Sequence, residues 1–269
     1  MYRISSLSDG KSRGDYLKTV MRALTENAAV FFIITVMVYA FYGAVLGVSL
    51  MPSAFIICKY IELMGVRSVV SIFLFAVILG LSLYVFWITS LLVFGITERL
   101  LTLGLKPGKY HRHSGTVARW LVYSGLHVVL INLSLPYMIG TPFAEMYFRL
   151  IGVKMGKHVF INTVKVFDPY LLEFGDNVVV GGFSQITCHI FEGERLILGK
   201  VKIGSNTLIC AESFIMPGVT IGNHCSIGVC SYVRKNRTIP DNTITMAMPG
   251  VSPQRIVELI KDNSKESGV

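Results

Sequence analysis

A β-branched aliphatic residue recurs every six positions along the C-terminal part of the chain. The series is unbroken and comprises Ile197, Ile203, Ile209, Ile215, Ile221, Ile227, Val233 and Ile239. A helix repeats every 3.6 residues and a simple strand every two, so neither produces this spacing. The residue two positions before each member from Ile203 to Val233 is small or β-branched, and turn pairs such as Pro217–Gly218 fall between them. The period therefore predicts short strands that alternate with tight corners.

A single unit of six residues cannot bury its own aliphatic side chain, but stacked units can. The sequence therefore predicts a hexapeptide solenoid. An earlier block keeps the same period at Met155, Ile161, Phe174, Val180 and Ile186. One residue is gained near Asp168–Pro169, and a larger interruption falls between Ile186 and Ile197. We expect the solenoid to cover 154–250 and to be irregular at these two places.

Two apolar runs precede the repeat. No charged residue interrupts Asn27 to Cys58 or Ser68 to Thr97, and each run exceeds the roughly 20 residues that cross a bilayer as a helix. Only 15% of the chain is charged, against about 25% in a usual soluble domain. We therefore expect a transmembrane helical hairpin over 27–98, with a buried hairpin in a soluble protein as the alternative.

Cations concentrate on the two outer flanks of this hairpin. The arm 1–26 is rich in Lys and Arg, and 99–119 carries five of them without any Asp or Glu. The loop between the apolar runs has only Lys59, Glu62 and Arg67. Because cation-rich flanks stay in the cytoplasm, both outer flanks are predicted to be cytoplasmic. Anionic lipid headgroups then account for the basic segments without nucleic acid.

A third apolar segment, 120–144, contains Pro136, Gly140 and Pro142. These residues favour a re-entrant or interfacial element over a clean span, which would move the solenoid outside. The predicted organisation is thus a cytoplasmic basic arm (1–26), the hairpin (27–98), a basic loop with an interfacial or re-entrant helical segment (99–153), the solenoid (154–250) and a C-terminal helix or tail (251–269).

The hexads resemble those of the hexapeptide-repeat acyltransferases. The runs DPYLLEFGDNVVVGG, HIFEGERLILGKVKIG and GTPFAEMYFRLIGVKMGKHV are similar to the membrane-associated terminal domain of bacterial poly-lysine synthetases and to related stand-alone acetyltransferases. The resemblance implies a mixed fold, in which transmembrane α-helices precede an all-β left-handed parallel β-helix with three hexads per coil. It also implies a homotrimer with sites between neighbouring prisms, an acyl-CoA donor and a histidine base.

His189 is the candidate base, because it stands where the six-residue phase breaks, in CHIFEGERL. Loops that leave a regular scaffold often carry chemistry, and imidazole titrates near neutral pH. An ordinary loop histidine is the alternative. The other histidines lie at corners of the repeat, in the basic segment or alone in an apolar run: His158, His224, His111, His113 and His127.

A carboxylate is expected to orient the His189 ring. Four candidates are near in the sequence or on a lower coil, namely Glu192, Glu194, Glu173 and Asp168, of which we predict Glu192 and Glu173. The resemblance places the coenzyme along the C-terminal coils. Arg234 and Lys235 are then the predicted partners of its phosphates, although solvated corner charges explain them equally well. The five cysteines show no metal-binding spacing, so no metal is expected.

These features predict an integral membrane acyltransferase whose solenoid lies on the cytoplasmic side. It would move an acetyl-like acyl or an aminoacyl group from acyl-CoA, or another thioester, to a hydroxyl or amine of a membrane-associated or exported acceptor. The expected partners are the lipid bilayer, the donor, the acceptor and further copies of the chain, without nucleic acid. The alternatives are a non-enzymatic membrane-anchored scaffold and a zinc enzyme of the γ-carbonic-anhydrase type, which needs three converging histidines.

Overall fold

The computed structural model describes residues 27–245. The predicted basic arm (1–26) and the predicted C-terminal helix or tail (251–269) lie outside the described residues. The chain begins with two long helices, α2 (Ala28–Met64) and α3 (Val69–Thr102). The side chain of Asn27 accepts hydrogen bonds from the first turn of α2, and Ser68 forms a capping box with Ser71 at the start of α3.

The helical hairpin is apolar on all faces. Large side chains such as Phe32, Met51 and Val69 are more than half exposed, so the hairpin presents an extended apolar surface. Among residues 27–245, three helices are long and apolar enough to cross a membrane: α2, α3 and α4 (Gly115–Leu133). The last of them is enclosed by other parts of the protein to a greater extent than the first two.

The segment between the hairpin and the solenoid contains one strand and three helices. They are β1 (Gly108–His111), α4, α5 (Leu135–Met138) and α6 (Pro142–Ile151). Ser134 separates α4 from α5, and α6 begins with Pro142 at its first position. Gly152 ends α6 in the left-handed conformation that a glycine tolerates best. The prolines and glycines of the sequence thus stand at the helix boundaries.

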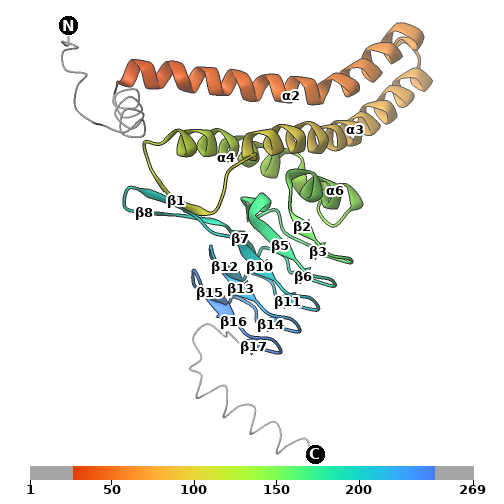
Figure 1. Ribbon diagram of the computed structural model, residues 1–269. Helices are drawn as coiled ribbons and strands as arrows, with labels where there is room; N and C mark the ends of the chain where they lie inside the picture. The colour runs from red at the N-terminus through yellow and green to blue at the C-terminus, as the bar shows by residue number, and fades with distance from the viewer. Residues whose placement is uncertain (1–26, 246–269) are drawn as a thin grey trace, which may run out of the picture.

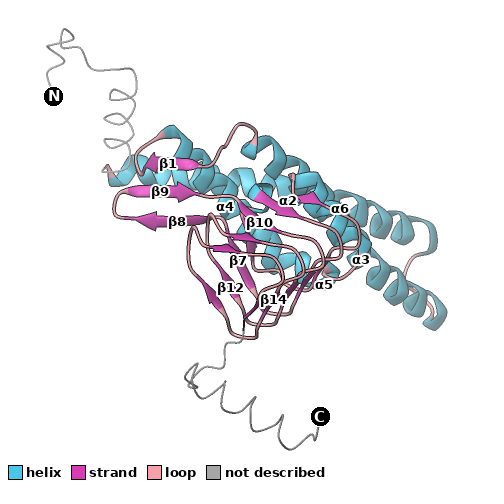
Figure 2. Ribbon diagram, turned by 60° about the horizontal axis from the view of Figure 1, so that its bottom comes forward, coloured by secondary structure: helices cyan, strands magenta, loops and turns pink. Residues whose placement is uncertain are grey.

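The solenoid is a three-sided prism of parallel strands (Figure 2). Coil 1 holds β2 (Lys154–Met155), β3 (Phe160–Ile161) and β4 (Val166–Phe167), and coil 2 holds β5 (Leu172–Phe174), β6 (Val179–Val180) and β7 (Gln185–Thr187). Coil 3 holds β10 (Val201–Ile203), β11 (Leu208–Ile209) and β12 (Phe214–Ile215). Coil 4 holds β13 (Thr220–Ile221), β14 (Ser226–Ile227) and β15 (Tyr232–Val233), followed by β16 (Thr238–Ile239) and β17 (Ile244–Thr245).

The six-residue series forms the interior of the prism. From Ile203 to Ile239 every member of the series is buried, with side chains stacked on the equivalent residues of adjacent coils. Ile197 is the exception, because it lies outside the prism in a hairpin and is only partly buried. In coil 1 the buried residue is Val166, so the phase there differs by one residue from the sequence period.

Both irregularities predicted from the sequence are present. The residue gained after coil 1 is accommodated at Asp168, whose left-handed backbone precedes a short 3-10 helix at Pro169–Leu171. The larger interruption is a β-hairpin formed by β8 (His189–Glu192) and β9 (Arg195–Leu198). The hairpin leaves the prism and pairs antiparallel with β1, which gives the three-stranded sheet β1-β9-β8 (Figure 2).

The helices cover the first coil of the prism as a separate layer (Figure 1). Contacts between α3 and α4, and between α3 and α6, hold this layer together. Its core is continuous with that of the prism, from Phe94 and Leu126 in the helices to Leu172 in coil 2. The prism and the apolar helices therefore share one hydrophobic core.

Candidate active site

The β8–β9 hairpin is an insertion between two coils. Asn223 and Asp241 contact each other across adjacent coils and are 18 residues apart, whereas Asp176 and Ser205, which flank the insertion, are 29 apart. Gly193 turns the hairpin with a φ of 55°, as a two-residue loop requires. The insertion starts with His189 at the prism wall, so the regular scaffold fixes the position of this side chain.

Asp168 is the carboxylate that contacts His189. Its Oδ2 lies 2.5 Å from Nδ1 of His189. The carboxylate is nearly fully buried, whereas the imidazole side chain is 23% exposed. An ionised Asp168 accepts the Nδ1 proton, and this fixes the tautomer in which Nε2 has a free lone pair. In residues 27–245 no hydrogen bond engages Nε2, so this nitrogen is available to a substrate.

Aromatic rings hold the His189 imidazole from two sides. The Trp120 ring of α4 packs edge-on against it, with 4.8 Å between ring centroids, and Phe167 packs similarly at 6.3 Å. Trp120 also donates its indole N–H to Oδ1 of Asp168 at 2.7 Å. The site is thus assembled from α4, the end of coil 1 and the hairpin.

The other titratable groups beside Asp168 remain neutral. Burial raises the pKa of the Cys188 thiol well above its usual value, and the Asp168 carboxylate adds to this effect. Burial likewise raises the pKa of the Tyr170 hydroxyl, again with a contribution from Asp168. A thiolate nucleophile at Cys188 is therefore disfavoured, and the site depends on the imidazole.

The two glutamates predicted as partners of His189 lie elsewhere. Glu192 stands at the far end of β8 and forms an ion pair with Lys235. Glu173 is on the outer face of β5, between Lys200 at 2.7 Å and Lys154 at 3.1 Å. The hydrogen bonds from Lys200 and Lys154 lower the pKa of Glu173 to about 2. The structure therefore brings Asp168 to the imidazole, and not Glu192 or Glu173.

The two predicted phosphate partners of the coenzyme differ in their surroundings. Lys235 is tied to the hairpin through Glu192. Arg234 is exposed and lines an open groove of about 560 Å³ at the outer end of the prism, together with Arg237 and Tyr232. Both cations follow β15, so they lie on the coils to which the sequence assigned the coenzyme.

The remaining histidines have other surroundings. His158 and His224 are exposed, and each occupies a left-handed corner with a φ of 54°. His111, in β1, lies 3.4 Å from Glu194. His127 is buried in α4, where Nε2 donates to the carbonyl oxygen of Val166 at 2.8 Å.

His127 belongs to a second buried cluster. Its Nδ1 lies 3.1 Å from Oε2 of Glu98 in α3, and the hydroxyl of Tyr147 in α6 donates to the same Oε2 at 2.7 Å. Glu98 is fully buried and its Oε1 has no partner within the described part of the chain. The cluster ties α3, α4 and α6 together around one carboxylate.

Glu98 and Trp120 were not predicted as functional residues from the sequence. A glutamate that directly follows an apolar run is a detectable signal, because a carboxylate at that depth needs a partner. Trp120 offered no such signal, since tryptophans are common in apolar segments and its partner Asp168 lies 48 residues away.

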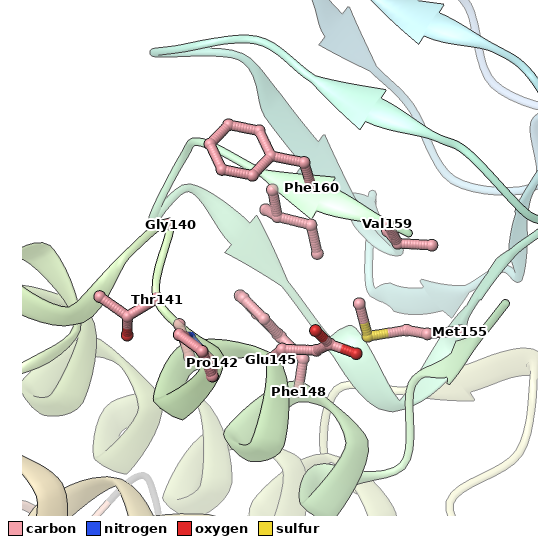
Figure 3. Close-up of a pocket in the computed structure, with 10 residues that line it drawn as sticks. Gly140, Thr141, Pro142, Glu145, Phe148, Met155, Val159 and Phe160 are labelled. Carbon is pink, nitrogen blue, oxygen red and sulfur yellow. The ribbon is translucent and has the colours of Figure 1, made fainter. Parts of the chain in front are cut away.

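A separate pocket of about 170 Å³ lies between the start of α6 and the strands β2 and β3 (Figure 3). Its wall is mostly apolar, with Phe148, Met155 and Phe160 among the lining residues. Its only acid, Glu145, is paired with Arg149. None of the residues predicted for the active site lines this pocket.

The zinc alternative needs at least three converging ligands. Within residues 27–245 no three His, Cys, Asp or Glu side chains form such a group. His189 in addition uses Nδ1 for Asp168. The arrangement resembles a carboxylate-oriented general base more closely than a set of metal ligands.

Comparison with known proteins gives a consistent picture. The family model described as "Bacterial transferase hexapeptide (six repeats)" matches residues 200–235. The chain is 28% identical over 150 residues to the delta-poly-L-ornithine synthetase of Acinetobacter baumannii strain AB307-0294. That match covers 54% of this chain but only 11% of the much longer synthetase.

A second relative is matched over most of its length. "Putative colanic acid biosynthesis acetyltransferase WcaF" of Escherichia coli strain K12 is 30% identical over 135 residues, which cover 41% of this chain and 73% of the relative. Among solved structures, a maltose O-acetyltransferase from Clostridium difficile 630 covers 56% of this chain and 93% of its own, with 23% identity and a TM-score of 0.42.

Proposed function

Because the chain belongs to the hexapeptide-repeat acyltransferase family, we propose that it is a membrane-anchored acyltransferase with His189 as general base. It moves an acetyl-like acyl or an aminoacyl group from a thioester to a hydroxyl or amine. The observation that carries this proposal is the His189–Asp168 pair at the one place where an insertion leaves the prism. A buried carboxylate on Nδ1 and a free Nε2 are what a general base requires.

The chemistry follows from this arrangement. Nε2 of His189 takes the proton of the acceptor hydroxyl or amine while the acceptor oxygen or nitrogen attacks the thioester carbonyl carbon. The imidazolium that forms is stabilised by Asp168, which accepts the Nδ1 proton throughout. When the tetrahedral intermediate collapses, the carbon–sulfur bond breaks and the imidazolium returns its proton to the thiolate. Direct transfer of this kind needs no acyl-enzyme.

Acyl-coenzyme A is the proposed donor. Relatives carry acetyltransferase names, and an acetyl group is available to the cell mainly as a thioester. Arg234 and Lys235 are the proposed partners of the coenzyme phosphates, since both cations lie on coil 4, to which the hairpin is linked through Glu192. A carrier-protein thioester would use the same base and would need a different basic surface.

The apolar helices are the proposed membrane anchor. A helix of 37 residues is about 55 Å long, which exceeds the roughly 30 Å hydrocarbon core. The hairpin of α2 and α3 is therefore proposed to cross the bilayer with a strong tilt. Its tip carries the Lys59–Glu62 pair at the external interface. The basic segment 99–119 and the prism then lie on the cytoplasmic side, where acyl-CoA is made.

The proposed assembly is a homotrimer. On the prism face formed by β3, β6, β11, β14 and β17, four strands expose an apolar side chain, namely Phe160, Val179, Leu208 and Ile244, and Ser226 of β14 interrupts the row. Exposed apolar rows of this size usually mark an interface. A neighbouring prism on this face would create a groove between copies in which donor and acceptor can meet.

The acceptor is proposed to be held at the membrane, because a reaction between two soluble substrates would not need a membrane anchor. A lipid-linked sugar, or an amine-bearing compound on its way to export, has the required hydroxyl or amine. The experiment incubates the purified full chain in detergent or nanodiscs with acetyl-CoA, longer acyl-CoAs and membrane extract, and identifies acylated products by mass spectrometry.

The matched control is His189→Ala. General-base catalysis contributes about 10²–10⁴-fold, so we expect this variant to lose nearly all product while its unfolding temperature stays the same. Equal product from both proteins would remove His189 from the mechanism. Failure of the wild type with every donor would favour the scaffold alternative.

A further inference from the structure

We propose that Trp120 is a positioning residue of the active site, so that α4, a helix of the apolar layer, completes the catalytic constellation of the prism. This inference rests on the proposed function. Trp120 contacts Asp168, and Asp168 in turn contacts His189.

The carboxylate of Asp168 is shared between two donors. Oδ1 accepts the indole N–H of Trp120 at 2.7 Å, and Oδ2 faces Nδ1 of His189 at 2.5 Å. A planar carboxylate held at both oxygens cannot rotate about its Cβ–Cγ bond. Since Asp168 is only 2% exposed, water does not replace a lost donor easily. The indole therefore fixes which oxygen is presented to the imidazole.

The same side chain also restrains the imidazole ring. Trp120 is 4% exposed, and its ring packs edge-on against His189. It packs in the same manner against Phe191, two residues further along β8. Trp120 thus positions both Asp168 and His189, through a hydrogen bond to the carboxylate and a ring contact with the imidazole.

The helix is itself anchored to the strand that leads to Asp168. Trp120 and His127 are seven residues apart, so they lie on the same face of α4, two turns from each other. His127 donates to the carbonyl oxygen of Val166, two residues before Asp168. The helix therefore holds the end of coil 1 at two points, and movement of α4 would displace Asp168.

The hydrogen-bond donor to Oδ1 of Asp168 is provided by a part of the chain outside the repeat. The prism supplies Asp168 and His189 by itself, but no prism residue donates to Oδ1 in the described part of the chain. A prism from which the helical layer is displaced would keep the base and lose the orientation of its carboxylate. Catalysis is thereby coupled to the docking of α4.

A double-mutant cycle tests this proposal. The variants are Trp120→Phe, Asp168→Gly and the double variant, because glycine fits the left-handed backbone at position 168 and leaves no side chain for the indole to orient. With acetyl-CoA and membrane extract, Trp120→Phe is expected to lower kcat about tenfold at unchanged KM. In the Asp168→Gly background the same change is expected to alter the rate less than twofold, because Trp120 acts through the carboxylate.

A second readout requires no turnover. Diethyl pyrocarbonate modifies an unprotonated imidazole, and peptide mass spectrometry reports the rate at His189 alone. We expect Trp120→Phe to change this rate at least about threefold with Asp168 present, and not in the Asp168→Gly background. If the modification rates show coupling between Trp120 and Asp168 but no acyl donor is turned over, the proposed function is rejected and the positioning role of Trp120 is kept.

Two controls address folding. Trp87→Phe alters the only other tryptophan, which stacks on Tyr137 at 4.4 Å, and should leave both readouts unchanged. In the Trp87→Phe background, 3-benzothienylalanine can replace Trp120 with a sulfur in place of the N–H while the ring shape is kept, and should reproduce the tenfold loss. Equal effects of Trp120→Phe with and without Asp168, or full activity with the sulfur isostere, would overturn the proposal.

Discussion

Two histidine–carboxylate pairs in residues 27–245 have a buried carboxylate, and they differ in how the imidazole is used. In the first, His189 faces Asp168 at 2.5 Å, and its side chain is 23% exposed. In the second, His127 faces Glu98 at 3.1 Å, and the two side chains are 2% and 0% exposed. His127 uses both ring nitrogens inside the protein, whereas His189 uses only Nδ1.

Under the proposed function, this difference separates the reactive pair from a structural one. A general base needs a nitrogen that reaches the acceptor, and only His189 has one. The His127 pair joins three helices and satisfies a backbone carbonyl, so its contribution is expected in stability and not in catalysis. Pairing with a carboxylate alone does not define the active site; access to Nε2 does.

The largest effect is expected for Asp168→Asn. The amide NH₂ would face Nδ1 of His189, so the ring would adopt the tautomer with the proton on Nε2 and could not act as a base. Turnover should fall about 10³-fold at least, by analogy with the loss caused by a wrong histidine tautomer in serine proteases. Initial rates with acetyl-CoA measure this effect, and thermal unfolding should change little. A rate within tenfold of the wild type would contradict the role of Asp168.

Substitutions in the His127–Glu98 pair should change the stability of the protein. Removal of one partner of a buried ion pair costs about 3–5 kcal/mol, so Glu98→Ala should lower the unfolding temperature strongly. Glu98→Gln should cost far less, because an amide can accept from Tyr147 and donate to Nδ1 of His127. Calorimetry in detergent measures the unfolding temperatures of both variants.

The rate per folded molecule is the control for the Glu98 variants. It should stay within a few-fold of the wild type for Glu98→Gln, since Glu98 touches neither His189 nor Asp168. A loss as large as that of Asp168→Asn would show that the second pair takes part in catalysis, and the distinction between the two pairs would fail.

A smaller effect is expected for Glu173, one of the two glutamates predicted from the sequence. Its pKa is lowered to about 2 by Lys200 and Lys154, below the usual value near 4.3. The stabilisation is therefore present above about pH 4.5 and is lost as the pH falls towards 2. Because the lysines are 42% and 74% exposed, Glu173→Gln should cost less than about 1 kcal/mol at pH 7.

Denaturant unfolding at pH 7 and at pH 3 checks this prediction; Lys202→Gln, which removes a third cation 3.5 Å from Glu173, should show a smaller change of the same sign. The difference between wild type and Glu173→Gln should shrink at the lower pH, and turnover should remain within twofold. A tenfold loss of turnover would instead return Glu173 to the list of active-site carboxylates.

The smallest effect is expected for Glu192→Gln. Its ion pair with Lys235 is on the surface, and such pairs contribute about 0–1 kcal/mol. Activity at saturating donor should be unchanged, and any effect should appear in the KM for acetyl-CoA through Lys235. Steady-state kinetics at varied acetyl-CoA concentration separate an effect on kcat from an effect on KM. A fall in kcat at saturating donor would place Glu192 closer to the chemistry than the structure does.

The fold was largely predictable because the repeat has a strict physical cause. A stacked coil buries one aliphatic side chain per corner-to-corner unit, so the period of Ile203 to Ile239 reports the prism directly. The position of His189 at an insertion was predictable for the complementary reason, since an insertion must interrupt the period, while its role as the base stays a prediction. Only Ile197 misled, because the hairpin strand β9 happens to continue the same spacing.

The partners of His189 were not predictable in the same way. Asp168 was one of four candidate carboxylates, and its selection depends on the extra residue that turns the chain after coil 1. Trp120 reaches the site from a helix 48 residues earlier in the chain. Contacts of this kind depend on how the helical layer docks on the prism, and no periodic signal in one sequence records that docking.

The most direct test of the account is a structure of the full chain with bound coenzyme A, determined by electron cryo-microscopy in a nanodisc. The account predicts that the coenzyme sulfur lies beside the Nε2 edge of His189, in direct contact or through one water molecule, while Asp168 remains on Nδ1. A coenzyme thiol at another corner of the prism, with Nε2 of His189 covered by protein, would contradict the central claim.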